Sequence, residues 1–271
     1  MITKNQIKLI KQLEQKKFRR REGLFVAEGP KVVGDLMKRW EPVAVYATDD
    51  YSPTTTVNNL QRISSEELRK VSFLQHPQQV LALFSLPKDA TSESSSRPFV
   101  SGISASGQTI FADSASKDSP LVLALDGVQD PGNLGTIIRL ADWFGIDTII
   151  CSEETADAWN PKVVQATMGS IARVSISYIN LPEYLDSLPQ DVPVYGTLLD
   201  GDNIYEQELS TGGIIVMGNE GNGLTEKVRR RVNRRLLIPS YRTDDTAESL
   251  NVAIATAIVC AEFRRRGSDC R

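Results

Sequence analysis

The sequence predicts an α/β protein built mainly around a parallel sheet, and three observations support that fold class. Short apolar runs typical of buried strands recur through the second half of the chain, at residues 121–126, 147–151, 194–199, 214–217 and 236–238. Segments with helical periodicity lie between them, and strands that alternate with helices form parallel sheets covered on both faces. Several runs stop at glycine, asparagine or proline, so polar loops are expected at the carboxyl ends of the strands, where such sheets bind ligands.

The helices expected between these strands have apolar side chains on one side of a 3.6-residue period. The first begins at Pro131 and has Leu134 and Ile138 on its apolar side. Residues 172–179 are strand-like. The other helices are expected near residues 161–167, 182–188 and 249–263, with a short charged helix after Gly223.

The first ninety residues predict a smaller α/β domain. Residues 5–17 have apolar side chains at helical spacing and a basic outer face, and a basic loop is expected after them. A second helix is expected after the break at Gly29 and Pro30. Two serines before two glutamates, at residues 64–67, are typical of a helix N-terminus. Strands are expected at residues 24–27, 42–48 and 80–86.

Residues 91–119 are rich in serine and glycine and nearly empty of large apolar residues. Such composition is typical of a linker or a surface insertion, here with a small hairpin around residues 104–108. The predicted organisation is therefore a small α/β domain over residues 1–90, this linker, and a larger domain over residues 120–271.

Composition and charge restrict the class of protein. Of 271 residues, 24% are charged, and the net charge of −3 hides a basic front end. The first forty residues hold eleven basic and four acidic side chains, a net charge of +7. This asymmetry indicates a face that binds a polyanion, and the alternative is a solvated helix surface.

Localisation and metal content follow from the same composition. No apolar run approaches the roughly 20 residues that a membrane span needs, and the charged N-terminus is unlike a secretory signal, so a cytoplasmic protein is expected. The three cysteines have no spacing typical of zinc sites or disulfide frameworks. His76 is the single histidine, which argues against a multi-histidine metal site and against a Ser-His-Asp site.

The glycine-rich loop at residues 218–223, GNEGNG, differs from the known phosphate-binding loops. It lacks the GxGxxG pattern and has no Lys-Ser or Lys-Thr after its glycines. The loop taken alone is compatible with an ordinary turn, and ATP and dinucleotide cofactors are disfavoured.

Three segments taken together are more specific than any one of them. They are DPGNLGTIIRLADWFG, IIVMGNEGNGL and LLIPSYRTDDTAESLNVAIATAIV, which begin at residues 130, 214 and 236. In this order and spacing they closely resemble the signature motifs of the SpoU/TrmH branch of the SPOUT RNA methyltransferases, over residues 120–266. Residues 16–38 and 76–87 are similar to that family's N-terminal substrate-binding domain, a small α/β module that binds RNA.

The resemblance implies a fold, a cofactor and an assembly. The larger domain would be a parallel α/β sheet with a deep trefoil knot, which is rare among proteins, and it would form a homodimer with active sites at the subunit interface. Its loops would hold S-adenosylmethionine in a bent shape. No metal is required, because the methyl sulfonium donor carries its own leaving group. The residues at the family's donor-contact positions are Gly218, Ile238 and Leu250, with Leu198, Gly221 and Asn251 as neighbours.

The resemblance also implies the catalytic side chains. They are Asn133, Arg139, Glu220, Ser249 and Asn251. We expect Arg139 to orient the acceptor through its phosphate, because a guanidinium is effectively always protonated. Glu220 is expected to hold Arg139 or to accept the proton, and the general base stays open. Ser249 and Asn133 are equally compatible with helix-cap or turn roles.

The leading hypothesis is an S-adenosylmethionine-dependent methyltransferase of the ribose 2′-hydroxyl in structured RNA, ribosomal or transfer. RNA binding is assigned to the basic residues Lys16, Lys17, Arg19, Arg20 and Arg21. Two alternatives stay open, a non-catalytic RNA-binding protein on the same fold and an unrelated nucleotide-binding enzyme. One departure from the family is the loop at residues 239–248, which is longer than usual and carries three acidic side chains.

Overall fold

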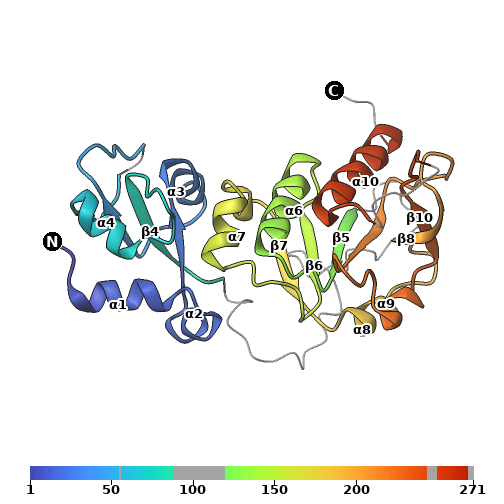
Figure 1. The fold of residues 1–271 in the computed structure, drawn as a ribbon, viewed down its shortest axis with the longest axis horizontal. Coiled ribbons are helices and arrows are strands. Elements are labelled where there is room, and N and C mark those ends of the chain that lie inside the picture. The colour runs from blue at the N-terminus through green and yellow to red at the C-terminus, as the bar shows by residue number, and fades with distance from the viewer. Residues whose placement is uncertain (55, 88–119, 243–248, 268–271) are drawn as a thin grey trace. The chain divides into compact units, whose positions relative to one another are not determined.

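The computed structural model describes residues 1–54, 56–87, 120–242 and 249–267 (Figure 1). The predicted hairpin and linker, and the acidic part of the loop before the last helix, lie outside these residues. The chain forms two compact units. The first contains Met1–Glu93 and Asp157–Arg173, and the second contains Ser94–Ala156 and Val174–Arg271. A short segment from the middle of the chain, residues 157–173, therefore packs with the N-terminal unit.

The first unit is a four-stranded sheet covered by short helices. The strands stand in the order β1-β4-β2-β3, with β4 antiparallel to β1 and β2, and β3 parallel to β2. The strand bounds are β1 Leu24–Glu28, β2 Ala44–Ala47, β3 Leu60–Arg62 and β4 Val80–Ser85. The helix bounds are α1 Lys4–Gln12, α2 Lys16–Glu22, α3 Pro30–Met37, α4 Ser65–Val71 and α7 Pro161–Ala166, followed by a 3₁₀ turn at Ser170–Ala172.

Two expectations for this unit have opposite outcomes. The helix start at residues 64–67 is confirmed as a capping box, in which Ser64 Oγ accepts from the Glu67 amide at 3.2 Å and Glu67 Oε2 accepts from the Ser64 amide at 2.9 Å. The expected basic loop is wrong. Residues 16–22 form α2, which ends at Gly23 with a left-handed φ of 65°.

The second unit is a six-stranded parallel sheet, as the sequence predicts. The strand order is β10-β8-β9-β5-β6-β7. The strand bounds are β5 Leu121–Asp126, β6 Thr148–Cys151, β7 Ser175–Tyr178, β8 Val194–Asn203, β9 Gly213–Gly218 and β10 Arg234–Leu237. The helix bounds are α6 Pro131–Trp143, α8 Leu181–Asp186, α9 Glu226–Arg229 and α10 Val252–Gly267.

Helices cover both faces of this sheet (Figure 1). Apolar residues of α8 and α9, among them Leu185 and Val228, share a core with Val122 and Val216 of the central strands. On the other face α6 packs against α10 and β6, and α10 against β9. Among the described residues, no helix is long and apolar enough to cross a membrane.

Candidate active site

The candidate site lies where β5 and β9 end side by side in the second unit. Asp126 and Gly218 are register partners at the last position of these two strands. The Asp126 carboxylate is buried and accepts from the Thr225 amide at 2.6 Å, and burial raises the pKa of this carboxyl group. Because Thr225 is the N-cap of α9, this bond fixes the chain that leaves the glycine-rich loop.

Gly218 has no room for a side chain. A Cβ atom at this position would lie 2.5 Å from the Leu224 nitrogen and against the carbonyl carbon of Gly223. The close approach that requires glycine here is therefore made by the protein's own backbone. The glycine-rich loop folds back over the end of β9.

Asn219 holds this loop in shape. Its amide and carbonyl pair with those of Gly223 at 2.9 Å each, and its side-chain Oδ1 accepts from the Gly221 amide at 2.9 Å and the Asn222 amide at 3.1 Å. The side-chain Nδ2 donates to the Gly127 carbonyl at 2.7 Å. The loop is thus fixed to the end of β5 by the chain's own hydrogen bonds.

Three of the predicted catalytic side chains form one hydrogen-bonded chain. Asn133 Nδ2 donates to Glu220 Oε1 at 2.9 Å, and Asn251 Nδ2 donates to Asn133 Oδ1 at 3.0 Å. Asn251 Oδ1 in turn accepts from the backbone amides of Ala253 at 3.0 Å and Ile254 at 3.3 Å. Each of the three sequence motifs contributes one member to this chain.

The direction of the two amide side chains follows from their partners. Only an oxygen can accept from the first amides of α10, so Asn251 must present its nitrogen to Asn133. Asn133 then accepts with its oxygen and presents its own nitrogen to Glu220, an acceptor when ionised. The donor direction therefore runs from the start of α10 to the Glu220 carboxylate.

The structure corrects the helix-cap roles left open for Ser249 and Asn133. The residue that caps the last helix is Asn251, and Ser249 lies two residues earlier with an exposed side chain. Asp130 is the N-cap of α6 and accepts from the Asn133 amide at 2.8 Å, so the Asn133 side chain is left for the chain to Glu220. The expected pairing of Glu220 with Arg139 does not form, since Glu220 is bonded to Asn133.

Arg139 occupies the exposed side of α6, two turns after its start. Among the described residues its guanidinium makes no hydrogen bond or ion pair. All five of its donors are therefore available to a ligand.

α6 and α10 run parallel and are joined at both ends. Their N-termini are connected by the bond between Asn133 and Asn251. At the other end Arg264 donates from Nε to the Phe144 carbonyl at 2.6 Å and from a terminal nitrogen to the Gly145 carbonyl at 2.7 Å. This double attachment fixes the position of Asn251.

The apolar residues expected to contact the cofactor lie in β8, directly after β10 and just before α10. Leu198 in β8 is 9% exposed and packs in the core with Val216 and Leu224. Ile238 follows β10 directly and is half-buried, and Leu250 is 50% exposed. Gly221 is exposed on the glycine-rich loop. Partly exposed apolar side chains such as those of Ile238 and Leu250 suit an adenine ring, which needs apolar contact and backbone hydrogen bonds.

The basic residues of α2 do not all face solvent. Lys16, Lys17, Arg20 and Arg21 are exposed. Arg19 is 1% exposed, donates to the Leu13 carbonyl at 2.7 Å and forms an ion pair with Asp157. The guanidinium of Arg19 thus holds the first unit together, and we leave it out of the RNA-binding surface proposed below.

Sequence reasoning missed two polar features. One is a pocket in the first unit whose polar lining includes Asp50, Arg69 and Gln78. The signal for it was the polar pair of glutamines directly before a buried strand. The other is the basic run at residues 227–235, where Arg229 and Arg231 form ion pairs with acidic side chains of the same unit.

Comparison with known proteins agrees with this site. The model of the SpoU rRNA Methylase family matches residues 120–261, and the model of the MRM3-like substrate binding domain matches residues 4–82. The 23S rRNA (guanosine(2553)-2′-O)-methyltransferase RlmP of Bacillus subtilis is 32% identical over 268 residues, covering 96% of this chain and 97% of that protein.

Solved structures give the same result. A putative RNA methyltransferase of the TrmH family from Porphyromonas gingivalis superposes with a TM-score of 0.81 and 37% identity, covering 98% of this chain and 99% of that one. An rRNA methyltransferase from Sinorhizobium meliloti with bound S-adenosylmethionine has a TM-score of 0.76 and 28% identity, covering 98% and 96%.

The fold and the site therefore define an RNA methyltransferase. The chain belongs to the SpoU rRNA methylase family. It is an enzyme that uses S-adenosylmethionine to methylate the 2′-hydroxyl of a ribose in RNA.

Proposed function

We propose that this enzyme methylates the 2′-hydroxyl of one guanosine in 23S ribosomal RNA. The relative from Bacillus subtilis, which aligns over nearly the whole of both chains, acts on that class of nucleotide. That alignment carries the proposal for the target, and the hydrogen-bonded chain from Asn251 through Asn133 to Glu220, which assembles all three motifs of the family in one place, supports the chemistry.

The cofactor would supply the methyl group from a positively charged sulfonium. After transfer, the rest of the cofactor would leave as a neutral thioether. We assign its binding to the apolar side chains of Leu198, Ile238 and Leu250 and to the backbone at Gly218, Gly221 and Asn251. Leu250 and Asn251 directly precede α10, so their position depends on the cap that Asn251 provides.

In the transfer the acceptor 2′-oxygen bonds to the methyl carbon, the carbon–sulfur bond breaks and the hydroxyl loses its proton. Arg139, with five free donors, binds the acceptor phosphate and holds the 2′-oxygen in line with the methyl group. Glu220 and Asn133 fix the loop edge next to it, and Ser249 adds an exposed hydroxyl from the segment before α10. Glu220 is one candidate to receive the proton, because one of its oxygens has just a weak contact, 3.5 Å from the Gln129 amide.

The basic face of α2 is proposed to bind RNA phosphates. Lys16, Lys17, Arg20 and Arg21 are exposed in the part of the chain that matches a substrate-binding domain. The cationic ends of Lys17 and Arg21 lie 4.9 and 4.7 Å from the Phe18 ring centroid, which supports their side chains in an extended, solvent-facing position.

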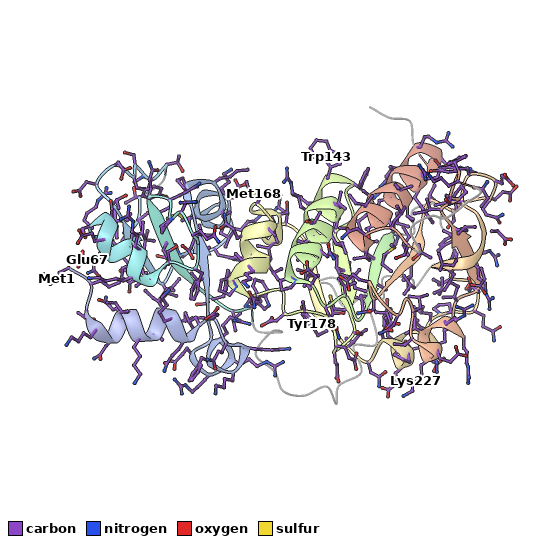
Figure 2. The ribbon with its side chains drawn as sticks, in the orientation of Figure 1. Met1, Glu67, Trp143, Met168, Tyr178 and Lys227 are labelled. Atoms are coloured by element: carbon purple, nitrogen blue, oxygen red, sulfur yellow. The ribbon has the colours of Figure 1, made fainter. Side chains whose placement is uncertain are left out.

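A trefoil knot and a homodimer complete the proposal. The path of the chain after β10 supports the knot. β10 lies at the edge of the sheet beside β8, but the helix that follows it, α10, packs on α6 and on β9 near the middle of the sheet. Exposed apolar side chains on α6 and α10 support the dimer. Trp143 is 83% exposed and Ile254 is 54% exposed, and Figure 2 shows Trp143 pointing away from its helix into solvent.

A mixed-dimer assay tests whether the site is shared between subunits. Arg139→Ala and Asn251→Ala chains are purified separately, mixed, unfolded and refolded together. The refolded mixture should regain up to about a quarter of wild-type activity if each site takes Arg139 from the other subunit, because half of the dimers are mixed and each of these has one intact site. Mixed dimers that form and stay inactive contradict the shared site. They do not contradict the methyl-transfer reaction itself.

The experiment for the RNA target is a methylation map of ribosomal RNA from cells with and without this enzyme. Loss of a single 2′-O-methylguanosine in 23S RNA, restored by the wild-type chain and not by Arg139→Ala, is the expected result. An unchanged 23S map together with a lost 2′-O-methyl group in transfer RNA contradicts the proposed target.

A further inference from the structure

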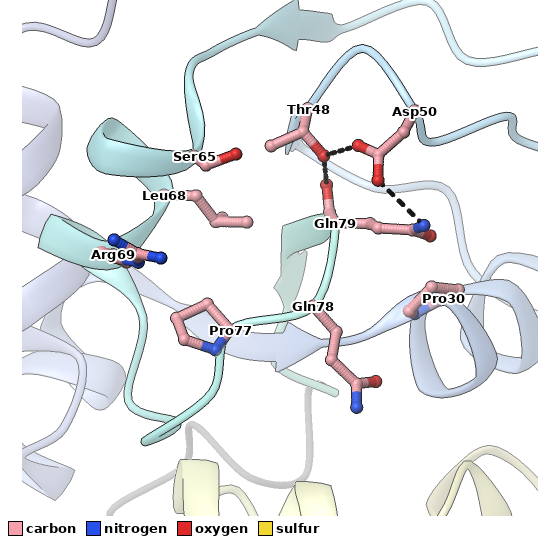
Figure 3. A pocket seen from close by; sticks show the side chains of 9 residues that line it. All are labelled: Pro30, Thr48, Asp50, Ser65, Leu68, Arg69, Pro77, Gln78 and Gln79. Atoms are coloured by element: carbon pink, nitrogen blue, oxygen red, sulfur yellow. Dashed lines mark hydrogen bonds between the residues drawn. The ribbon is translucent and has the colours of Figure 1, made fainter.

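A pocket of about 490 Å³ opens in the first unit, whereas the methyltransferase site belongs to the second. Volumes of this size are typical of small-molecule sites. It lies within the part of the chain that matches a substrate-binding domain. Its lining residues are Pro30, Thr48, Asp50, Ser65, Leu68, Arg69, Pro77, Gln78 and Gln79 (Figure 3).

One wall of the pocket has a strained backbone. Gln79 has a φ of +46°, in the left-handed region that side chains other than glycine rarely adopt. Its side-chain Nε2 donates to Asp50 Oδ2 at 3.1 Å, and the Thr48 hydroxyl lies between Asp50 Oδ1 and the Gln79 carbonyl, 3.1 Å from the latter. Strain that the surroundings hold in this way is concentrated at ligand sites.

Polar groups with free hydrogen-bonding capacity face each other across the pocket. A carboxylate has about four acceptor positions, and Asp50 uses two of them for Thr48 and Gln79. The hydrogen bond from Thr48 keeps the pKa of Asp50 below its usual value, so this group is ionised. Within the described part of the chain, the Arg69 guanidinium and the side-chain amide of Gln78 make no hydrogen bond. Figure 3 shows Asp50 and Arg69 on opposite sides of the pocket.

The apolar lining consists of Pro30, Leu68 and Pro77. Rigid apolar surfaces accept the face of a flat ring. An inorganic anion is disfavoured by the Asp50 carboxylate, and a simple cation is disfavoured by Arg69. A planar molecule that carries donors on one edge and acceptors on the other satisfies both.

Guanine has this pattern. Its Watson–Crick edge has N–H donors at N1 and N2 that a carboxylate accepts, and its O6 and N7 atoms accept from an arginine. Sequence-specific proteins read RNA mostly at unstacked bases, by stacking and by hydrogen bonds to these edges.

We propose that this pocket binds one unstacked guanosine of the RNA substrate, separate from the nucleotide that is methylated. Asp50 reads the donor edge of the base, Arg69 reads its acceptor edge, and the two prolines contact its face. The pocket thereby helps to select the RNA. This inference rests on RNA as the substrate and not on which nucleotide is methylated.

The test measures binding of two fluorescein-labelled single-stranded hexaribonucleotides to the full-length chain by fluorescence anisotropy. One probe is all uridine and the other has one guanosine at its third position. We expect the guanosine probe to bind at least about fivefold more tightly. Arg69→Ala and Asp50→Asn should each abolish this preference.

Lys70→Ala is the matched control, because Lys70 is the next residue on α4, exposed, of the same charge, and absent from the pocket lining. It should keep the preference, and all variants should bind S-adenosylmethionine as the wild type does. Equal affinity of the wild type for both probes overturns the proposal. So does an equal effect of Arg69→Ala and Lys70→Ala, which would make Arg69 one more charge on a basic face. A wrong methylation target would instead appear in the ribosomal RNA map and leave this preference unchanged.

Discussion

The side chains of Asn133 and Asn251 are joined by a 3.0 Å hydrogen bond although 118 positions of sequence separate them. This bond connects the starts of two parallel helices, α6 and α10. Asn251 simultaneously caps α10, and Asn133 simultaneously holds Glu220. The start of the last helix is thereby coupled to the glycine-rich loop that carries Glu220.

Replacing Asn251 separates its two roles. Asn251→Ala removes both the cap and the donor to Asn133, so we expect a loss of about 1 kcal/mol in the free energy of unfolding and weaker S-adenosylmethionine binding. Asn251→Asp keeps an oxygen that caps α10 and places a second acceptor against Asn133 Oδ1. It should therefore retain the stability and still lose cofactor affinity. Denaturation and calorimetry on both variants measure this, and wild-type cofactor affinity in Asn251→Asp contradicts the coupling.

Arg139→Ala should leave stability and cofactor affinity nearly unchanged, because the side chain is exposed and unbonded within the described part of the chain. Methyl transfer should fall by about 10²–10³, the usual effect of losing one preorganised electrostatic contact. Arg139→Lys should recover part of the rate, since it keeps the charge and loses the planar fork. Single-turnover rates with labelled cofactor give the answer, and a Lys variant as fast as wild type would argue against phosphate positioning by the fork.

Gly218→Ala and Gly221→Ala test which glycine is structural. The new methyl group at residue 218 would meet backbone 2.5 Å away, whereas at residue 221 the nearest atom lies at 3.6 Å. We expect the first change to cost at least about 2 kcal/mol of unfolding free energy, because backbone cannot move aside cheaply. The second should be close to neutral for stability. Equal melting temperatures for the two variants would contradict the close approach at the end of β9.

RNA affinity should depend on salt through α2. Changing Lys16, Lys17, Arg20 and Arg21 to Ala should lower the slope of log Kd against log salt by up to about one unit per lost phosphate contact. The control is the double change of Lys31 and Lys38, which are exposed but already paired with Asp35. An unchanged slope after the four α2 changes would make α2 an ordinary solvated surface, and an equal loss per charge in the control would mean that α2 has no special role.

Stability should decrease in acid through Glu262. Its carboxylate is 6% exposed and accepts hydrogen bonds from Arg265 and Arg266. These bonds lower the pKa of Glu262 to about 2, and the bond from Arg265 has the larger effect. A depressed folded-state pKa contributes stability above about pH 4.5 that is lost as the pH falls towards 2. Glu262→Gln should cost about 1–3 kcal/mol at pH 7 and flatten this acid dependence.

The control for that experiment is Glu226→Gln. Glu226 pairs with Arg230 at 2.9 Å on the surface, with 65% of its side chain exposed. An exposed pair contributes at most about 0.5 kcal/mol. Parallel pH–stability curves for Glu262→Gln and the wild type would contradict the assignment.

The strands and helix starts could be predicted because they depend on local pattern. β5 is an unbroken apolar run, and the capping box at Ser64 is a local signature. The far end of β8 could not be predicted, since Asp and Asn are disfavoured in strands and Asp202 and Asn203 are held there by pairing with β10. α2 has a single large apolar side chain, and what fixes it is the buried ion pair of Arg19 with Asp157, a contact across 138 positions.

The candidate site shows the same limit. The motif residues could be named from their resemblance to a family, but not their partners. Glu220 is equally suited by chemistry to Arg139 and to Asn133, and Ser249 is as good a cap by type as Asn251. In both cases the fold decides which of the two candidate residues lies within hydrogen-bonding distance. The pocket at Asp50 and Arg69 is assembled from four separate segments, and no single segment carries a motif for it.

The central claim is that this chain methylates a ribose of 23S RNA. The most direct measurement incubates the purified enzyme with ribosomal RNA from cells that lack it and with S-adenosylmethionine carrying a labelled methyl group. The RNA is then digested to nucleosides for mass spectrometry. We expect label in 2′-O-methylguanosine from 23S RNA with the wild type, and at least about a hundredfold less with Arg139→Ala. Label on a base, or equal label with both proteins, would contradict the claim.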